Sequence, residues 1–249
     1  MSGSGRKIVD LLTVEVIKVE NEDERAILNQ FQARTKELHQ DDATLLRFLR
    51  ARDHNVDKAE DMLRKSLEWR KHHEISTILK WNVPAFLDES LPFQFRGVDN
   101  KGGPVAWLPL GRWRGRHLVE SGKKQDCLRA AYYMFELCLH HVKQSGSRPT
   151  FVIFGMEGLS FYQISHLETM QTFFYGFQQL EQNYPEILRK LYVINAPWIF
   201  ATAFAFVKPV MSPRTLAKIE VYGSDKNKWL PLLMDSMPKD VIPTEYLEN

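Results

Sequence analysis

One segment limits how this chain can fold more than any other. Across residues 198–207 only Thr202 is polar, and the other side chains are aromatic, aliphatic or alanine. Pro197 suits the first turn of a helix and Pro209 cannot continue one, so we expect a helix over residues 198–207. A helix that is apolar on every side is either buried or meets lipid, and without further information a buried helix is the simpler prediction.

Strands are expected on both sides of this helix. LYVIN at residues 191–195 and KIEVYG at residues 218–223 are rich in β-branched and aromatic side chains, as buried strands are. Two ionisable residues, Glu186 and Lys218, bracket the whole segment. On their own, a glutamate and a lysine so far apart predict nothing, because most such residues lie on the solvated surface.

The charge balance argues against nucleic acid as a partner, because 33 Lys and Arg nearly cancel 31 Asp and Glu. The 15 Phe, 8 Tyr and 6 Trp are enough for a large core and a lined cavity. Cys127 and Cys138 would be about 16 Å apart on one predicted helix, too far for a disulfide. The sequence has no apolar signal core, no myristoylation pattern and no run of about 18 apolar residues, so we expect a cytoplasmic protein.

The first part of the chain predicts an all-helical unit that ends near residue 80. Residues 11–19 fit either a strand or a short amphipathic helix. Helices are expected from Glu22, after the capping residues Asp41 and Asp42, and after Asn55, with a short helical turn at residues 75–79. No Gly- or Pro-rich linker follows, so this unit should pack on the rest of the chain.

Strands and helices alternate after Pro84. The pattern predicts two strands joined by a turn at 99–103, then a helix at 123–143, a strand at 150–154, a helix at 164–180 and a closing helix near 227–233. This alternation favours an α/β fold built on a mixed, largely parallel sheet flanked by helices. We therefore divide the chain into an all-helical N-terminal lobe at residues 1–80 and an α/β domain at residues 81–249.

Several phrases of the sequence resemble the CRAL-TRIO family of lipid-transfer proteins and follow the order found there. They are LLRFLRAR, LEWRK, GVDNKGGPV, KKQDCLR, MEGLS, NYPEILRKLYVINAP and PRTLAKIEVYG. The resemblance covers residues 25–247 and is specific for the fold. These motifs are more similar to the supernatant protein factor and tocopherol-associated branch than to the fungal-type phosphatidylinositol-transfer branch. In the former branch a GOLD β-sandwich usually follows the lipid domain.

The resemblance implies the CRAL-TRIO lipid-binding fold, in which the sheet is the floor of an apolar lipid pocket. The helix at residues 198–207 would be a movable gate that closes the pocket and enters a membrane when it swings out. Its apolar side chains include Trp198, Ile199, Phe200, Phe204, Phe206 and Val207. The pocket wall is expected to include Tyr132, Thr150, Phe151, Phe173 and Phe177, although each of these is individually more often plain core.

The resemblance also implies a head-group site. Members that bind phosphatidylinositol carry a Glu after a Tyr-Pro pair and a Lys in the penultimate strand, at the positions of Glu186 and Lys218. A lysine ammonium suits phosphate, and a carboxylate accepts hydrogen bonds from inositol hydroxyls. Thr215 and, from the facing lobe, Arg52 are further candidates. Asp53 stands where the fungal-type branch has a basic residue, so that side of the site is less well supported.

Phosphatidylcholine is a second ligand that the resemblance leaves open. In the fungal-type branch, hydroxyl residues on the strand before the Gly-Leu turn meet the choline phosphate. Thr150 keeps one hydroxyl, but Val152 replaces the other, and Gly155 stands where an Asp is common.

Enzyme and metal patterns are weak. GLSFY has no second glycine and therefore no nucleophile elbow, and the sequence has neither a GxxxxGK nor a GxGxxG loop. Cys138 and His141 share one helix face, but a second pair of metal ligands does not accompany them. We expect no catalytic residues, no metal and no cofactor.

Three functions remain after these exclusions. The preferred one is a cytosolic carrier of a single lipid, most of all phosphatidylinositol, that exchanges its ligand at a membrane surface by opening the gate helix. The second is a carrier or sensor of a neutral isoprenoid such as a tocopherol, a retinoid or squalene. The third is a regulatory module that binds a protein partner. We expect a monomer that makes transient membrane contact and binds no nucleic acid.

Overall fold

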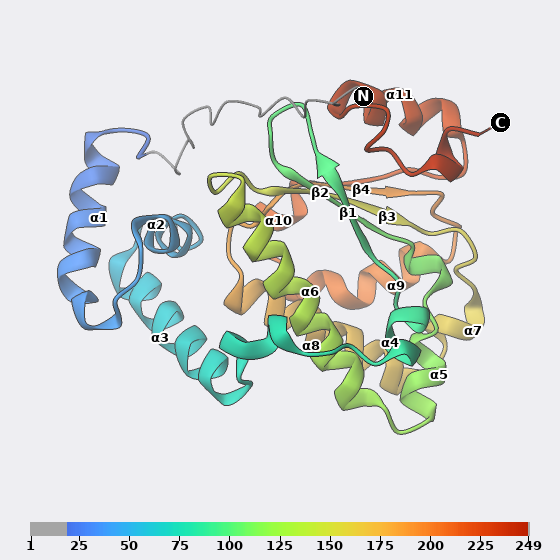
Figure 1. The fold of residues 1–249 in the computed structure, drawn as a ribbon, viewed down its shortest axis with the longest axis horizontal. Helices are drawn as coiled ribbons and strands as arrows, with labels where there is room; N and C mark the ends of the chain where they lie inside the picture. The colour runs from blue at the N-terminus through green and yellow to red at the C-terminus, as the bar shows by residue number, and fades with distance from the viewer. Residues whose placement is uncertain (1–18, 249) are drawn as a thin grey trace, which may run out of the picture.

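The computed structural model describes residues 19–248 of the 249-residue chain. Nearly all of the segment at residues 11–19, which fits a strand or a helix by sequence, lies outside the described residues. The described part has a group of helices at its N-terminal side and a five-stranded sheet with helices on both faces (Figure 1).

The N-terminal helices begin where the capping residues predict. They are α1 (Glu22–Arg34), α2 (Asp42–Arg50) and α3 (Val56–His72), with the 3-10 turns η1 (Lys36–Leu38) and η2 (Ile75–Lys80). The side chains of Asn21, Asp41 and Asn55 each accept a backbone N–H of the first turn that follows them. The three helices enclose a core of their own, formed by Leu28, Phe31, Leu45, Leu46, Phe48, Leu49, Ala59, Met62 and Leu63. The boundary at residue 80 stays a prediction.

The sheet has the strand order β1-β2-β3-β4-β5. Its strands are β1 (Gln94–Val98), β2 (Pro104–Leu108), β3 (Thr150–Gly155), β4 (Leu188–Ile194) and β5 (Ile219–Val221). β1 pairs antiparallel with β2, and all other neighbours are parallel. In the hairpin turn, the Asp99 side chain accepts the backbone N–H groups of Lys101 and Gly103. The predicted α/β class and the largely parallel sheet are confirmed.

The remaining helices connect and cover the strands. They are α4 (Ala85–Ser90), η3 (Leu110–Arg112), α5 (Gly115–Glu120), α6 (Lys124–Gln144), α7 (Phe161–Ile164), α8 (Leu167–Asn183), α9 (Phe200–Val207), η4 (Lys208–Val210), α10 (Pro213–Leu216), α11 (Lys226–Ser236) and η5 (Thr244–Tyr246). α11 and the C-terminal segment cover one face of the sheet, whereas α6, α8 and α9 lie on the other face (Figure 1).

Two helices begin later than the sequence predicts. The long helix α8 starts at Leu167 instead of residue 164, because a capping box of Ser160 and Gln163 starts the separate short helix α7. The apolar helix α9 starts at Phe200, and Trp198 and Ile199 form the turn before it. In that turn the N–H of Phe200 donates to the carbonyl of Pro197, so Pro197 lies outside the helix and not in its first turn.

Candidate functional site

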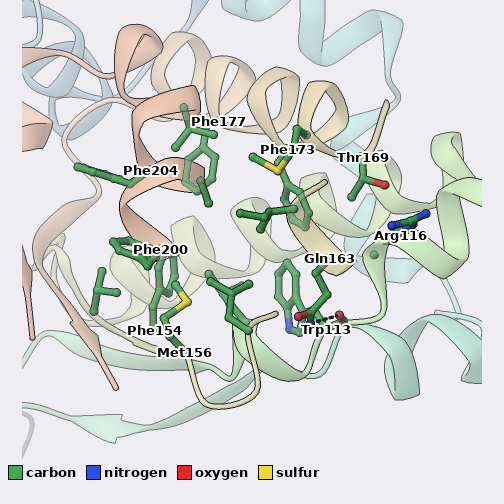
Figure 2. A pocket seen from close by; sticks show the side chains of 18 of the residues that line it. Trp113, Arg116, Phe154, Met156, Gln163, Thr169, Phe173, Phe177, Phe200 and Phe204 are labelled. Carbon is green, nitrogen blue, oxygen red and sulfur yellow. Dashed lines mark hydrogen bonds between the residues drawn. The ribbon is translucent and has the colours of Figure 1, made fainter. Parts of the chain in front are cut away.

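An apolar cavity lies between the sheet and the helices α5, α7, α8 and α9 (Figure 2). It encloses about 810 Å³ of space that no atom fills, including the part open to solvent at its mouth. The walls of this cavity are almost entirely apolar, so their chemistry fits an apolar ligand.

Alternation along the strands decides which side chains form the floor of the cavity. In β4, Leu191 and Val193 face the cavity, whereas Tyr192 and Ile194 belong to the core on the opposite face. Phe154 of β3, paired with Val193, and Ile219 of β5, paired with Leu191, complete this part of the floor.

α9 closes one side of the cavity with a single face. Phe200, Ala203, Phe204 and Val207 line the cavity, and their spacing of three and four residues places them on one face of a helix. The opposite face is exposed: Ala201, Thr202, Ala205 and Phe206. Figure 2 shows Phe200 and Phe204 at one end of the cavity. Although nearly all side chains of α9 are apolar, those on one face of the helix are exposed.

The other gate residues named from the sequence do not line the cavity. Trp198 is 85% exposed in the turn before α9, and Ile199 is buried there. Phe206 is 37% exposed and makes an edge-on ring contact with Phe174 of α8. Trp198 is thus an apolar side chain left largely in water, and Phe206 is only partly covered.

Polar side chains occur at one end of the cavity only. They are Arg116, Gln163 and Thr169, and Figure 2 shows them at the end opposite to Phe204. Each has a protein partner: Arg116 donates to Glu120 and to the carbonyl of Tyr162, Gln163 donates to the carbonyl of Gly111, and Thr169 bonds the His166 ring. The cavity therefore has an aromatic end and a polar end whose polar groups are already paired.

Two of the five side chains expected in the pocket wall are there. Phe173 and Phe177 of α8 line the cavity, and Phe173 stacks on Trp113 with ring centroids 6.3 Å apart. Their position follows from the face that α8 turns toward the sheet.

Tyr132, Thr150 and Phe151, the other three residues expected in the pocket wall, do not line this cavity. Tyr132 packs edge-on against Trp69 of α3, with ring centroids 5.0 Å apart, because α6 turns this side chain toward the helical lobe. Phe151 points to the opposite face of the sheet from the cavity and belongs to the core under α11. Neither ring reaches the cavity.

Thr150 is fully buried, and its hydroxyl lies 3.0 Å from the sulfur of Cys138. Burial raises the pKa of the Cys138 thiol to about 11, and the hydrogen bond with Thr150 lowers it by a smaller amount. The Thr150 hydroxyl is therefore part of the packing between β3 and α6.

Two of the four side chains expected to bind a head group, Glu186 and Lys218, are in contact with each other, and none of the four lines the cavity. The Lys218 ammonium donates to the Glu186 carboxylate at 2.9 Å, although the two residues are 32 positions apart. Both side chains are about one-fifth exposed. Thr215 bonds the hydroxyl of Ser212, and Arg52 donates to the carbonyl of Ala51. Glu186 and Lys218 thus form a half-buried pair beside the start of β4.

Arg214 is a member of this group that the sequence reasoning missed. Its guanidinium lies 3.5 Å from the Glu186 carboxylate and 2.8 Å from the Asp53 carboxylate. Asp53 lies in the loop between α2 and α3, at the position where the fungal-type branch has a basic residue. In this chain the Asp53 carboxylate pairs with the Arg214 guanidinium of α10, which also lies beside Glu186.

The cavity lining contributed by loops was also missed. Trp113 follows η3, and Met156 and Leu159 belong to the MEGLS phrase after β3. The phrase was a visible signal, because it is one of those that resemble the lipid-transfer family. Its side chains could not be assigned to a wall without knowing that this loop packs on Gly111, where a Cβ would collide with Met156 and Glu157.

Metal-binding clusters and membrane-spanning helices are two other features that the described residues could contain. Within residues 19–248 no group of three His, Cys, Asp or Glu side chains could hold a metal ion. Over the same residues, no helix is long and apolar enough to cross a membrane.

Comparisons with known proteins agree with this geometry. The family model for the CRAL/TRIO domain matches residues 88–246, and the model for the CRAL/TRIO N-terminal domain matches residues 18–65. Protein real-time of Drosophila pseudoobscura pseudoobscura is 30% identical over 209 residues, and this chain spans only 31% of its length while 80% of the chain is covered. The crystal structure of Sfh5 superposes with a TM-score of 0.63 at 17% identity, over 92% of this chain and 96% of Sfh5.

Proposed function

The chain belongs to the CRAL/TRIO family of lipid-binding and lipid-transfer proteins, and from that premise we propose that it carries one lipid at a time between membranes. The observation that carries this proposal is the apolar cavity of about 810 Å³ with one wall made by a single face of α9. The proposed ligand is phosphatidylinositol, with phosphatidylcholine as an open second ligand. The protein acts as a monomeric carrier in the cytoplasm, without catalysis.

The head group would be selected by Glu186 and Lys218. Their ion pair shows that two groups with the right chemistry for inositol hydroxyls and for phosphate lie within reach of each other. Arg214 adds a second cation, 45% exposed, beside the same carboxylate. Thr215 follows Arg214 on α10, and Arg52 precedes Asp53, the other partner of Arg214, so we include both in the proposed site. A bound phosphate would take over the Lys218 ammonium, and Glu186 would keep Arg214 as its partner.

The gate would be α9. Its inner face lines the cavity, and the side chains of Trp198 and Phe206 are exposed next to it. Exposed apolar side chains also occur on α7 and at the start of α8, where Phe161 is 69% and Leu167 is 63% exposed. Because these elements border the cavity, their burial in a lipid surface would bring the mouth to the membrane.

A neutral isoprenoid ligand has one specific observation in its favour. All three polar side chains that line the cavity already have protein partners, and Glu186 and Lys218 lie outside the lining. A ligand without a polar head group would leave no group of the wall unsatisfied. In this second candidate function, Glu186 and Lys218 are a surface ion pair.

Identification of the bound lipid tests the proposal. The purified protein is examined by native mass spectrometry, incubated with vesicles that contain phosphatidylinositol, phosphatidylcholine and a tocopherol, and examined again. Uptake of phosphatidylinositol that Lys218→Ala abolishes supports the phospholipid carrier. Lys190→Ala is the matched control, because Lys190 pairs with Glu220 on the same sheet at similar exposure.

Uptake of the tocopherol alone, equal in both variants, would move the function to the isoprenoid carrier. A protein that takes up none of these lipids would contradict both. The gate is tested separately by Phe204→Asp, which places a carboxylate on the cavity face of α9 and should slow lipid exchange between vesicles. Phe204→Leu keeps that face apolar and should exchange lipid at the normal rate.

A further inference from the structure

One carboxylate links the C-terminal segment to the residue that precedes the gate. Glu157 follows Met156 in the loop after β3, and this loop lines the cavity. One oxygen of Glu157 accepts a hydrogen bond from the side-chain amide of Asn195, and the other lies 3.3 Å from the hydroxyl of Tyr246. Glu157 is thus the shared partner of two segments that are far apart in the sequence.

Asn195 has the position of a hinge. It comes directly after β4 and starts the segment 195–199 that leads into α9. Its φ of 54° lies in the left-handed region, which non-glycine residues occupy only at a cost, although Asn tolerates it better than most. The next residue, Ala196, is tied to the sheet through the carbonyl of Tyr222 at 3.0 Å. The hydrogen bond to Glu157 is therefore made at the point where the chain leaves the sheet toward the gate.

Tyr246 is held rigidly at the other side of the carboxylate. It is 4% exposed, its ring packs against Trp229, and its hydroxyl accepts a hydrogen bond from the Trp107 indole at 3.2 Å. The adjacent Glu245 forms a two-pronged ion pair with Arg112 at 2.7 and 2.9 Å. The C-terminal turn η5 is therefore a fixed support against which Glu157 is placed.

The close approach of these groups depends on a glycine. At Gly155 a Cβ would collide with the Tyr246 hydroxyl and would lie 2.7 Å from the Glu157 carboxylate. The last residue of β3 thus leaves room for the link. Any side chain larger than that of glycine at this position would displace the Tyr246 hydroxyl or the Glu157 carboxylate.

We infer that Glu157 is a positioning residue for the gate, which holds Asn195 in the strained conformation of the closed state and ties it to the support at η5. The inference rests on the proposed function only in taking α9 as the element that opens. Loss of the carboxylate leaves the Asn195 amide without this partner and allows its backbone to leave the left-handed region. The segment 196–207 then opens more often, while the sheet and the cavity walls stay intact.

Hydrogen–deuterium exchange on the full chain, without added lipid, tests this inference. Glu157→Ala should speed exchange in peptides from residues 196–207 on the order of tenfold, the size expected for a lost charge-assisted hydrogen bond. Peptides from α6 should exchange at the normal rate. Glu157→Gln should restore slow exchange, because its amide can accept from Asn195 and donate to Tyr246. Glu220→Ala is the control, since Glu220 bonds Lys190 and Tyr222 on the same sheet and has no contact with the hinge.

A second pair of variants keeps the test decisive where Glu157→Ala folds poorly. Asn195→Gly keeps the left-handed backbone but removes the amide, so it should speed exchange in the gate alone. Tyr246→Phe should give a smaller increase at the same peptides, and Tyr222→Phe should give none. Unchanged exchange at residues 196–207 in these variants, or an equal increase across α6, would overturn the inference. Because lipid is absent, the outcome does not depend on which lipid the wild-type protein carries.

Discussion

The two faces of the sheet are built from the same strands, but one face is covered by a buried core and the other borders a cavity. Ile153, Tyr192 and Ile194 point toward α11, where they form one buried core with Trp229 and Leu233. The alternate residues of these strands point to the other side, which contains the cavity. Both sets of side chains are apolar, so hydrophobicity does not explain why one face is solid and the other hollow.

The difference comes from what covers each face. α11 and the C-terminal segment bring large side chains onto the strands, and Trp229 is only 1% exposed. On the other face α9 is a short helix, and side chains of α5, α7, α8 and α9 border the cavity. Whether a face is solid or hollow therefore depends on the side chains that the covering helices bring onto the strands, and not on the strands themselves.

Truncation of one large side chain on each face should give the largest difference in unfolding free energy between the two faces. Trp229→Ala should lower the free energy of unfolding by about 3–5 kcal/mol, because it creates a void in a filled core. Phe177→Ala should lower it by about 1–2 kcal/mol, because its ring already borders empty space and is only partly buried. Urea unfolding of both variants measures this. Equal losses would mean that the cavity is not a property of the native protein.

Added volume should also destabilise the solid face more than the hollow one. Ile153→Phe places extra atoms in the solid core and should cost up to about 3 kcal/mol of unfolding free energy. Val193→Phe adds them on the cavity side of β4 and should cost less, about 1 kcal/mol. The same Val193→Phe variant should retain little co-purified lipid. Lipid extracted from equal amounts of the variant and of wild type measures this. Strong destabilisation by Val193→Phe would show that the cavity wall is as tightly packed as the solid face.

Acid should lower stability through the helical lobe and leave the difference between the faces unchanged. The Arg50 guanidinium, hydrogen-bonded to Glu24, lowers the pKa of that buried carboxyl to about 2, and the His54 hydrogen bond adds to this. Since the folded pKa lies below the unfolded value, the stabilisation is present at neutral pH and is lost as the pH falls from about 4.5 toward about 2. The loss should reach about 2 kcal/mol.

Unfolding measured from pH 7 to pH 3 checks this expectation. Glu24→Gln should flatten the curve, whereas Trp229→Ala and Phe177→Ala should shift it without changing its shape. A pH-dependent gap between those two variants would show that a titrating group acts on one face of the sheet and not on the other.

Much of this fold follows from local signals in the sequence. The caps at Asp41 and Asn55 start their helices as predicted, and the β-branched runs become β3 and β4. The register of α9 was less certain, because an all-apolar run gives no contrast between inside and outside. Its start at Phe200 is set by the turn at Pro197.

The assignment of the cavity wall shows where sequence reasoning ends. Phe151 and Phe154 lie on one strand and differ only in the face they occupy, and nothing in the sequence says which face is hollow. Glu186 and Lys218 were paired only through the resemblance to a family. Arg214 was not found, because its partner Asp53 comes from another lobe and the pair exists only once the lobes pack together.

The paired polar end of the cavity has a consequence for what the proposed carrier would contain in a cell. Since Arg116, Gln163 and Thr169 are already hydrogen-bonded, the cavity tells two acyl chains apart mainly by the area each buries. One methylene contributes about 0.8 kcal/mol, which is roughly a fourfold preference. The abundance of lipid species differs between membranes by more than that. Cargo composition would then follow the supply of the donor membrane, and each loaded molecule would be a sample of the bilayer it last visited.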